Sequence, residues 1–211
     1  MGYQRFGNGV VLSTKHENYG FTLWYLSPSF CIRICTVAEK TRTKLKNIKI
    51  ALTGPESSGK TTMAKWISEH FSCQMIEEYA REFLSENHNY SIEDLNTIAI
   101  EQFKRNCTQI PIVVDTEMLV MKIWCEEKYQ HCTKEIEQLL NEQEMDHYFL
   151  CSPDIPWEED PLRENPKDRN RLFTLYENNL IEKGWPYSVL KGSVEERKQE
   201  VIKSLKGRVY I

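Results

Sequence analysis

The stretch Gly54–Thr62 limits what this chain can fold into more than any other feature. It reads Gly-Pro-Glu-Ser-Ser-Gly-Lys-Thr-Thr and satisfies the pattern G-x-x-x-x-G-K-[ST]. An apolar run, Ile48–Thr53, precedes it, and a helical pattern over Lys60–Phe71 follows it. A strand, a glycine-rich turn and a helix in this order let backbone N–H groups and the helix dipole face a phosphate. We therefore expect a phosphate loop here, and a chance match in an ordinary turn is the alternative.

The pattern also assigns tasks to single residues of this loop. The ammonium of Lys60 would neutralise the β- and γ-phosphates of a nucleotide, and the hydroxyl of Thr61 would ligate Mg²⁺. The predicted cofactors are therefore ATP and Mg²⁺. The remaining loop residues expected to contact the nucleotide are Gly54, Glu56, Ser57, Ser58, Gly59 and Thr62.

From Asn47 onward, short apolar runs alternate with helical patterns, which is typical of βα units and a parallel sheet. Helix starts are indicated by Ser91 with Asp94 and by Ser193 with Glu196, and Gly184 and Gly207 stand where helices would end. We predict an α/β fold of the P-loop NTPase, kinase-like type over residues 46–211, with a mostly parallel five-stranded sheet flanked by helices. The expected strands are Ile48–Thr53, Cys73–Ile76, Ile110–Val114, His147–Cys151 and Tyr187–Leu190.

Composition narrows the class of protein. A chain of 211 residues with 40% hydrophobic and 27% charged residues suits one folded domain of ordinary size. The net charge of −4 gives no general attraction to nucleic acid or to an anionic membrane, so neither is an expected partner. Seven cysteines without a C-x-x-C pair favour reduced thiols, and we expect a cytoplasmic protein.

Residues 1–45 differ in composition from the rest. Residues 1–46 hold seven Lys and Arg but two Asp and Glu. The run Phe21–Ala38 contains a proline and an arginine and is too short and polar for a membrane helix, and no signal peptide precedes it. We interpret the segment as a flexible basic tail, a docking segment or the product of a start codon assigned too far upstream. Deleting residues 1–44 is expected to leave activity and melting temperature nearly unchanged.

Carboxylates follow two of the expected strands. Asp115 comes directly after Ile112–Val114 and could serve as a partner of Mg²⁺ or as a catalytic base. Its alternative role is a helix N-cap, because Glu117–Tyr129 has a helical pattern, and both roles could coexist. The cluster Glu77–Glu82 follows the second strand, where it would face an acceptor substrate. A solvated, charged helix start is the other interpretation of that cluster.

The segment Ser152–Arg171 lies between an expected strand and an expected helix and holds four prolines and three arginines. An arginine-bearing lid that closes over a moving phosphoryl group stabilises its charge and excludes water. We assign Arg163 to the catalytic set and Arg169 to nucleotide binding. Arg171 is a third candidate, and some of these arginines would pair only with nearby carboxylates.

Taken in order, these motifs resemble the nicotinamide riboside kinase domain of the bacterial NadR-like proteins. The resemblance covers the chain from about Lys46 to its end, and the ordered combination is more specific than the phosphate loop alone. The matching residues are Gly54–Thr61, Glu78-Tyr79-Ala80-Arg81-Glu82, Val114-Asp115-Thr116, Trp157 with Asp160 and Arg163, and Pro186-Tyr187 with Gly192 and Glu196-Arg197.

The resemblance implies a kinase that transfers the γ-phosphoryl group of ATP to the 5′-hydroxyl of nicotinamide riboside in NAD salvage. It implies that Lys60, Asp115 and Arg163 act in catalysis. The substrate-binding residues that we predict on this basis are Glu78, Tyr79, Arg81, Asp115, Trp157 and Tyr187.

The aromatic members of that set have alternatives. We expect Trp157, and with it Tyr187, to stack on the flat cationic ring of the riboside. Packing within the lid is the other interpretation of Trp157, and Tyr187 stands at the start of an expected strand.

Two other functions fit the same motifs. One is an ATPase or nucleotide-switch module that acts through a partner, and the other is a kinase of a different nucleoside. The absence of an N-K-x-D motif from the sequence disfavours a GTPase, and the short chain disfavours an AAA-type motor. The oligomeric state stays open.

Overall fold

The structure is a computed structural model that divides into two units, Met1–Arg42 and Thr43–Ile211. It describes residues 2–6, 9–15, 21–26, 32–36, 44–85, 89–160, 163 and 165–210.

The first unit contains an antiparallel sheet. Its strands follow one another in the order β1-β2-β3-β4, each paired with the next. The strands predicted from the sequence do not include any in residues 1–45, so this sheet is an addition. The strands are β1 (Gly2–Phe6), β2 (Gly9–Lys15), β3 (Phe21–Leu26) and β4 (Ile32–Thr36).

Two of these strands occupy parts of the apolar run Phe21–Ala38, of which residues 27–31 and 37–38 lie outside the described residues. Across the described ranges, no helix combines the length and the apolar character that crossing a membrane requires.

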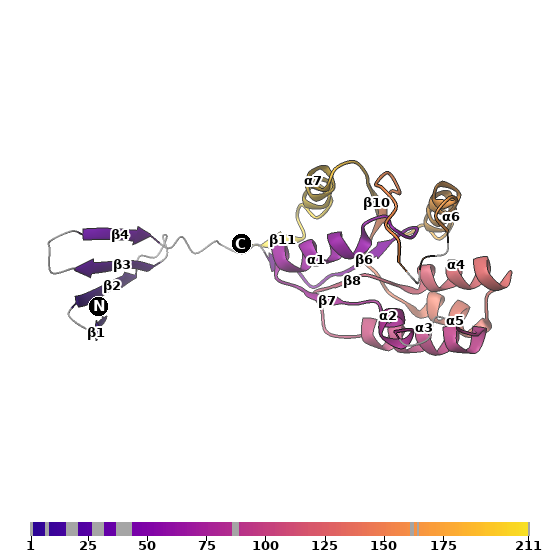
Figure 1. Ribbon diagram of the computed structural model, residues 1–211, viewed down its shortest axis with the longest axis horizontal. Coiled ribbons are helices and arrows are strands. Elements are labelled where there is room, and N and C mark those ends of the chain that lie inside the picture. The colour runs from indigo at the N-terminus through magenta and orange to yellow at the C-terminus, as the bar shows by residue number, and fades with distance from the viewer. Residues whose placement is uncertain are drawn as a thin grey trace. The chain divides into compact units, whose positions relative to one another are not determined.

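The second unit alternates strands and helices along the chain (Figure 1). Its strands are β5 (Lys44–Leu45), β6 (Lys49–Thr53), β7 (Gln74–Ile76), β8 (Ile112–Val114), β9 (His147–Cys151), β10 (Tyr187–Leu190) and β11 (Val209–Tyr210). Its helices are α1 (Lys60–Phe71), α2 (Tyr79–Phe83), α3 (Ile92–Asn106), α4 (Met118–Tyr129), α5 (Lys134–Glu142), α6 (Arg169–Glu182) and α7 (Val194–Ser204).

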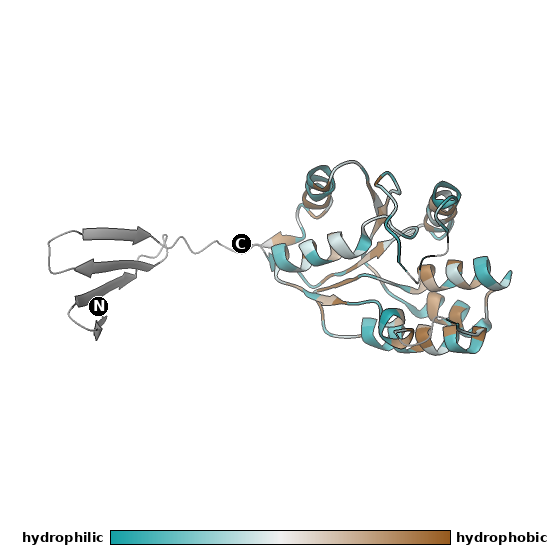
Figure 2. Ribbon diagram, in the orientation of Figure 1, coloured by the Kyte–Doolittle hydropathy of each residue, from teal (hydrophilic) through white to brown (hydrophobic). Residues whose placement is uncertain are grey.

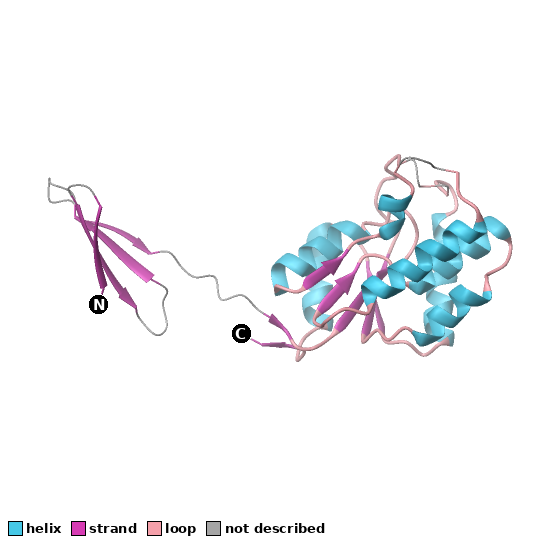
Figure 3. Cartoon of the chain, turned by 90° about the horizontal axis from the view of Figure 1, so that it is seen from below, coloured by secondary structure: helices cyan, strands magenta, loops and turns pink. Residues whose placement is uncertain are grey.

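Five strands form a parallel sheet in the order β10-β9-β6-β8-β7 (Figure 3). The sequence prediction of five strands and flanking helices is therefore confirmed. β8 begins at Ile112 rather than at the predicted Ile110. Pro111 has no N–H to donate, so the regular ladder begins after it.

Helix boundaries also follow local chemistry. Capping boxes join Ser91 to Asp94 at the start of α3 and Ser193 to Glu196 at the start of α7, as predicted. Helix α5 was not predicted. Its N-terminus is capped by the hydroxyl of Thr133, which accepts a hydrogen bond from the backbone N–H of Ile136.

The sheet separates two apolar cores, because successive strand residues point to opposite faces. Side chains from α1 and α7 cover one face of the sheet, and side chains from α3, α4, α5 and α6 cover the other. The central strands are correspondingly apolar (Figure 2). On β9, for example, Phe149 and Cys151 belong to the first core and Tyr148 and Leu150 to the second.

Strand order fixes where a ligand site can form. β6 lies between β9 and β8, so the connections that follow β6 and β8 lead to helices on opposite faces of the sheet. A crevice opens outside the carboxyl ends of parallel strands at such a point. The loop Gly54–Gly59 follows β6 directly and Asp115 follows β8, so both lie at this crevice.

A short strand pair marks the start of the second unit. β5 pairs antiparallel with β11, and the backbone N–H of Lys46 donates to the carbonyl of Arg208 at 2.8 Å. Leu45 is 1% exposed and packs in the core under α1 and α7. The predicted N-terminal segment, residues 1–45, includes Leu45, whereas the side chain of this residue is part of the second unit's core.

This boundary predicts different outcomes for two truncations. Removing residues 1–42 should change the unfolding temperature of the second unit by less than about 3 °C, because β5 is retained. Removing residues 1–46 deletes β5 and Leu45 and should lower that temperature by about 6 °C or more. Differential scanning calorimetry measures both. Equal temperatures for the two proteins would contradict the role of β5, and loss of folded protein on removing residues 1–42 would contradict the boundary.

Candidate active site

The phosphate loop has a backbone that two glycines make possible. Gly54 has a φ of +123°, and a Cβ atom there would lie 2.8 Å from the carbonyl oxygen of Cys151. Gly59 is the N-cap of α1 with a φ of +86°. Any residue with a side chain is strained at such φ angles, so the backbone conformation of the loop explains why the pattern has glycine at both positions. The turn brings the N-terminus of α1 directly after the loop, and this end of a helix attracts anions.

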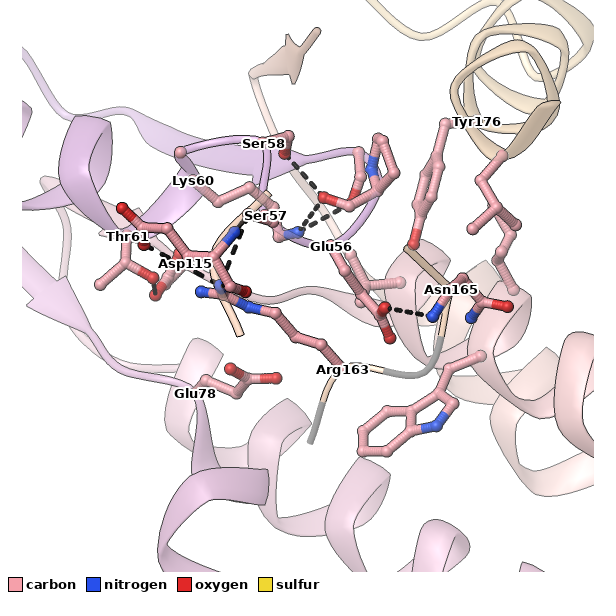
Figure 4. Close-up of a pocket in the computed structure, with 18 of the residues that line it drawn as sticks. Glu56, Ser57, Ser58, Lys60, Thr61, Glu78, Asp115, Arg163, Asn165 and Tyr176 are labelled. Atoms are coloured by element: carbon pink, nitrogen blue, oxygen red, sulfur yellow. Dashed lines mark hydrogen bonds and ion pairs between the residues drawn. The ribbon is translucent and has the colours of Figure 1, made fainter. Parts of the chain in front are cut away.

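Lys60 folds back over this loop. Its ammonium donates hydrogen bonds to the carbonyl oxygens of Gly54 and Pro55, each at 2.8 Å (Figure 4). Ser58 also donates to the carbonyl of Pro55, at 2.7 Å. The lysine is therefore held above the concave side of the loop, where it can meet a polyphosphate.

Asp115 meets the phosphate loop from β8. The hydroxyl of Thr61 donates to Oδ2 of Asp115 at 2.6 Å. Asp115 is 3% exposed, and its other oxygen, Oδ1, is buried without a hydrogen-bond partner among the described residues. Burial raises the pKa of this carboxyl, while the Thr61 hydroxyl and the Lys60 ammonium oppose that rise. The predicted meeting of Thr61 and Asp115 is thus present.

These oxygens fit a magnesium ion. Mg²⁺ takes oxygen ligands, keeps several of its waters and is bound through one or two protein groups near phosphates. The Thr61 hydroxyl and the Asp115 carboxylate supply such groups, and Oδ1 of Asp115 is a buried acceptor that no described residue contacts by a hydrogen bond. The alternative role of Asp115 as N-cap of α4 is wrong, because Glu117 takes that position and accepts from the N–H of Leu119.

Glu78 and Arg81 lie at the carboxyl end of β7, as predicted. Arg81 Nε lies 3.0 Å from Glu78 Oε2, and Arg81 Nη1 donates to Asp160 Oδ2 at 2.8 Å. Burial raises the pKa of the Glu78 carboxyl, and Arg81 and then Lys60 oppose the rise. The cluster is also a helix start, since α2 begins at Tyr79 and Glu78 is its N-cap residue.

The segment Ser152–Asp168 connects β9 to α6 and contacts the phosphate loop at Ser57, and we call it the lid. Residues 161, 162 and 164 lie outside the described part of it. The backbone N–H of Glu158 donates to Ser57 Oγ at 3.0 Å, and Arg163 Nη1 lies 3.4 Å from the same oxygen. Arg169, the first residue of α6, donates to the Ser57 carbonyl at 2.9 Å.

The three arginines predicted to belong to the lid, of which Arg169 and Arg171 lie in α6, therefore separate into two kinds. Arg163 and Arg169 reach the phosphate loop, whereas Arg171 pairs with Glu127 and Asp168 and is 53% exposed. Glu56 of the loop contacts the lid in turn, because its Oε2 accepts from the backbone N–H of Asn165 at 3.0 Å.

A buried arginine that sequence reasoning did not assign to a role supports the loop from α7. Arg197 is 2% exposed and donates to the carbonyl oxygens of Ser58 at 2.6 Å and Ser152 at 2.9 Å. It also pairs with Asp154. Its place in the motif Glu196-Arg197 was the one feature of the sequence that could have indicated a role for Arg197. The guanidinium ties the phosphate loop to the start of the lid.

One cavity joins the phosphate loop to an apolar wall from α4 and α6. Figure 4 shows Lys60, Thr61 and Asp115 on one side in this view and Tyr176 and Asn165 on the other. The residues that line it beyond the loop are Glu78, Arg81, Asp115, Val120, Ile123, Trp124, Glu127, Lys128, Ile155, Glu158, Arg163, Asn165, Leu172 and Tyr176. All loop residues predicted to bind nucleotide, Thr62 included, also line it.

Three predicted substrate residues do not line this cavity. Tyr187 begins β10, at the amino end of the parallel strands, and its hydroxyl lies 3.3 Å from Glu177. The phosphate loop follows the opposite, carboxyl end, so the prediction for Tyr187 needs correction. The Tyr79 ring packs under the guanidinium of Arg105, whose Cζ atom lies 4.2 Å from the centroid of that ring. Trp157 lies against Arg163 and Arg169.

The aromatic residues that do line the cavity were missed. Trp124 is held by a hydrogen bond from its Nε1 to the hydroxyl of Tyr90, at 2.6 Å. Tyr176 is 5% exposed and points into the cavity (Figure 4). Both lie within amphipathic helices, where an aromatic residue is indistinguishable in sequence from a core position.

Arg197 yields a prediction about stability. Arg197→Met removes a buried guanidinium and leaves its acceptors unmatched, so it should lower the free energy of unfolding by about 3 kcal/mol. Arg171→Met removes an exposed guanidinium and should cost less than about 1 kcal/mol. Urea unfolding of the two variants measures this difference. Equal losses would contradict the supporting role of Arg197.

Comparisons with known proteins place the domain in a wider group. Residues 49–197 match the model of a protein family described as AAA domain, which is more than half of the chain. No curated protein matches the sequence.

Solved structures show the same fold. The chain is similar to a NadR protein in complex with NAD and AMP-PNP and to one in complex with NR, each at 18% identity and a TM-score of 0.59 over 77% of this chain. It covers 49% and 51% of those chains, so it spans about half their length. It is also similar to deoxyadenosine kinase from M. mycoides, at 13% identity and a TM-score of 0.57, over 76% of this chain and 99% of that one. The fold is that of α/β P-loop NTPases of the kinase type.

Proposed function

The chain belongs to the family described as AAA domain, and within its P-loop kinase fold we propose that it is an ATP-dependent kinase of a nucleoside. The acceptor that we propose is nicotinamide riboside, phosphorylated at its 5′-hydroxyl to nicotinamide mononucleotide. The observation that carries this proposal is the single cavity that runs from the phosphate loop to an aromatic wall. Such a cavity can hold a polyphosphate and a second, ring-bearing substrate side by side.

The donor half of the proposal uses the phosphate loop and the lid. ATP would lie with its phosphates against the loop and the N-terminus of α1, where Lys60 replaces its bonds to Gly54 and Pro55 by bonds to phosphate oxygens. Arg163 and Arg169 already touch Ser57 and would meet the same phosphates. Magnesium held by Thr61 and Asp115 would neutralise charge on the β- and γ-phosphates.

The acceptor half uses Glu78. The sequence left open whether Asp115 is the catalytic base or a partner of magnesium. The bond from Thr61 favours the second role for Asp115. Glu78 lines the cavity and interacts electrostatically with both Lys60 and Asp115, so we propose it as the base on the acceptor side. Burial raises the pKa of Glu78, and a base whose pKa is nearer to neutrality accepts a proton more effectively.

The acceptor's ring would lie against Trp124 and Tyr176. These side chains come from two helices, α4 and α6, and replace Trp157 and Tyr187 as the proposed ring site. An aromatic face attracts a cationic ring, and the carboxylates of Glu56 and Glu127 line the same cavity. A nicotinamide ring in its riboside is flat and positively charged, so it suits this wall.

Phosphoryl transfer then follows from these positions. The 5′-oxygen forms a bond to the γ-phosphorus, the bond from that phosphorus to the bridging oxygen breaks, and ADP leaves with the electron pair. Glu78 takes the proton of the hydroxyl. Lys60 and Arg163 stabilise the charge that spreads over the moving group, and the lid excludes water that would otherwise hydrolyse ATP.

An ATPase or switch module remains the second candidate, because the family description alone would suit it. Such a module needs no binding wall for a second small molecule. The aromatic wall next to the phosphate loop therefore favours a kinase. Other nucleosides could also use a flat-ring site, and only turnover separates them from nicotinamide riboside.

Turnover tests the proposed reaction. ATP consumption should depend on nicotinamide riboside, with mononucleotide formed in equal amount. Lys60→Ala should lower kcat by about a hundredfold or more, because it removes charge stabilisation from the transition state. Lys65→Ala, an exposed change on the same helix, is the matched control. Hydrolysis of ATP at the same rate without riboside would favour the switch module, and turnover with other nucleosides alone would replace the acceptor.

The role of Glu78 has its own test. Glu78→Gln should lower kcat by about a hundredfold and leave KM for ATP within about twofold, because the side chain keeps its size but no longer accepts a proton. Glu77→Gln, at the exposed neighbouring position, should retain activity. Steady-state kinetics on both variants measures this. An unchanged kcat in Glu78→Gln would rule out the assigned base.

A further inference from the structure

Two amide side chains of α3, Gln102 and Asn106, are buried next to the segments that carry Glu78 and Asp115. We propose that they are positioning residues, which hold these two segments at a fixed separation and so place both carboxylates for the reaction. This inference rests on the proposed kinase function for the roles of the two carboxylates.

Gln102 and Asn106 occupy core positions of an amphipathic helix. The buried residues of α3 are Leu95, Ile98, Ala99, Gln102 and Asn106. Their spacing of mostly three or four residues places them on one face of the helix. Gln102 is 0% exposed and Asn106 is 4% exposed. A buried polar side chain is unfavourable unless its polar atoms are hydrogen-bonded, so the partners of these two amides indicate what they do.

Gln102 holds the backbone on both sides of Glu78. Its Oε1 accepts a hydrogen bond from the backbone N–H of Tyr79 at 2.7 Å, and its Nε2 donates to the carbonyl of Glu77 at 3.2 Å. β7 ends at Ile76 and α2 begins at Tyr79, so one side chain fixes the short connection between them. The carboxylate of Glu78 makes no capping bond to α2, and Glu78 lines the cavity. The position of this carboxylate therefore depends on the backbone that Gln102 holds.

Asn106 extends the same chain of hydrogen bonds to the segment that carries Asp115. Gln102 Nε2 donates to Asn106 Oδ1 at 3.0 Å, and Asn106 Nδ2 donates to the carbonyl of Thr116 at 3.2 Å. Thr116 directly follows Asp115, whose own backbone N–H donates to the carbonyl of Ile76 at 3.0 Å. The carboxyl ends of β7 and β8 are thus joined by a backbone bond and, through the two amides, by a second connection.

Filling space does not account for this pair. All four polar atoms of the two amides have partners, and apart from each other these partners are backbone groups next to Glu78 and Asp115. Apolar side chains of similar size would fill the same volume, whereas hydrogen bonds also fix the direction of the groups that they join. Neither amide is among the described residues that line the cavity, so each acts through the backbone and not on a substrate.

A small shift of either segment would affect a different property of the site. The proposed base, Glu78, must lie within hydrogen-bond reach of the hydroxyl that it deprotonates, and a displacement of about 1 Å can cost about a hundredfold in rate. Loss of the Gln102 amide should therefore act on kcat. A shift of Asp115 should instead weaken the effect of magnesium on nucleotide binding.

Three substitutions on α3 test this role. Gln102→Met and Asn106→Leu keep the apolar bulk of each side chain and remove its amide. Asn96→Leu is the control, because Asn96 accepts a hydrogen bond from the hydroxyl of Thr133 and neither residue lines the cavity. The measurements are kcat and KM with riboside, in the unaltered chain and in the Glu78→Gln background, and calorimetric titration of AMP-PNP with and without magnesium.

Gln102→Met should lower kcat by about thirtyfold and leave KM for ATP within about twofold. In the Glu78→Gln background the same change should lower kcat by less than about threefold, because the effects of residues that act through one carboxylate are not additive. Asn106→Leu should lower the factor by which magnesium strengthens AMP-PNP binding by about fivefold, and it carries the test if Gln102→Met does not fold. Asn96→Leu should change none of these values.

Equal losses of kcat in the two backgrounds would overturn the inference, because such a loss would not pass through Glu78. So would an unchanged kcat in folded Gln102→Met, or an unchanged effect of magnesium in folded Asn106→Leu. Absence of riboside turnover in the unaltered protein would defeat the proposed acceptor instead, and the magnesium titration would still decide the role of the two amides.

Discussion

The left-handed backbone at Gly54 and Gly59 lets the chain turn from β6 into α1 within a few residues and in contact with β9. A Cβ atom at Gly54 would press against the carbonyl of Cys151, so the close approach of loop and strand depends on that glycine. The turn places a helix N-terminus and the ammonium of Lys60 at the carboxyl end of the central strand. Every other group of the candidate site is arranged around this turn.

Three supports reach the loop from different parts of the chain. Asp115 comes from β8 and meets Thr61, Arg197 comes from α7 and binds the carbonyl of Ser58, and the lid contacts Ser57. Each support contacts a different residue of the stretch Gly54–Thr62. The parallel order of the sheet makes this possible, because it gathers the carboxyl ends of β6, β8 and β9 at one edge.

The loop, the five strands and the capping boxes could be predicted from the sequence, because each depends on a pattern of residues that are close together in the chain. That Thr61 and Asp115 lie close together could be predicted as well, since Asp115 directly follows β8 and Thr61 begins the helix after the loop that follows the neighbouring strand β6. Trp124 and Tyr176 could not, because a helical aromatic facing a cavity has the same spacing as one facing the core. Tyr187 was misassigned for a different reason. Its role came from the resemblance alone, whereas the start of a strand in a parallel sheet lies at the end opposite the phosphate loop.

The account depends most on the claim that Thr61 and Asp115 complete a magnesium-nucleotide site on the phosphate loop. Calorimetric titration of ATP with and without magnesium, on the unaltered chain and on Asp115→Asn, tests it most directly. We predict saturable one-to-one binding that magnesium strengthens in the unaltered chain, and loss of that strengthening in the variant with magnesium-free binding retained. Absence of saturable heat, or the same effect of magnesium in both proteins, would contradict the account.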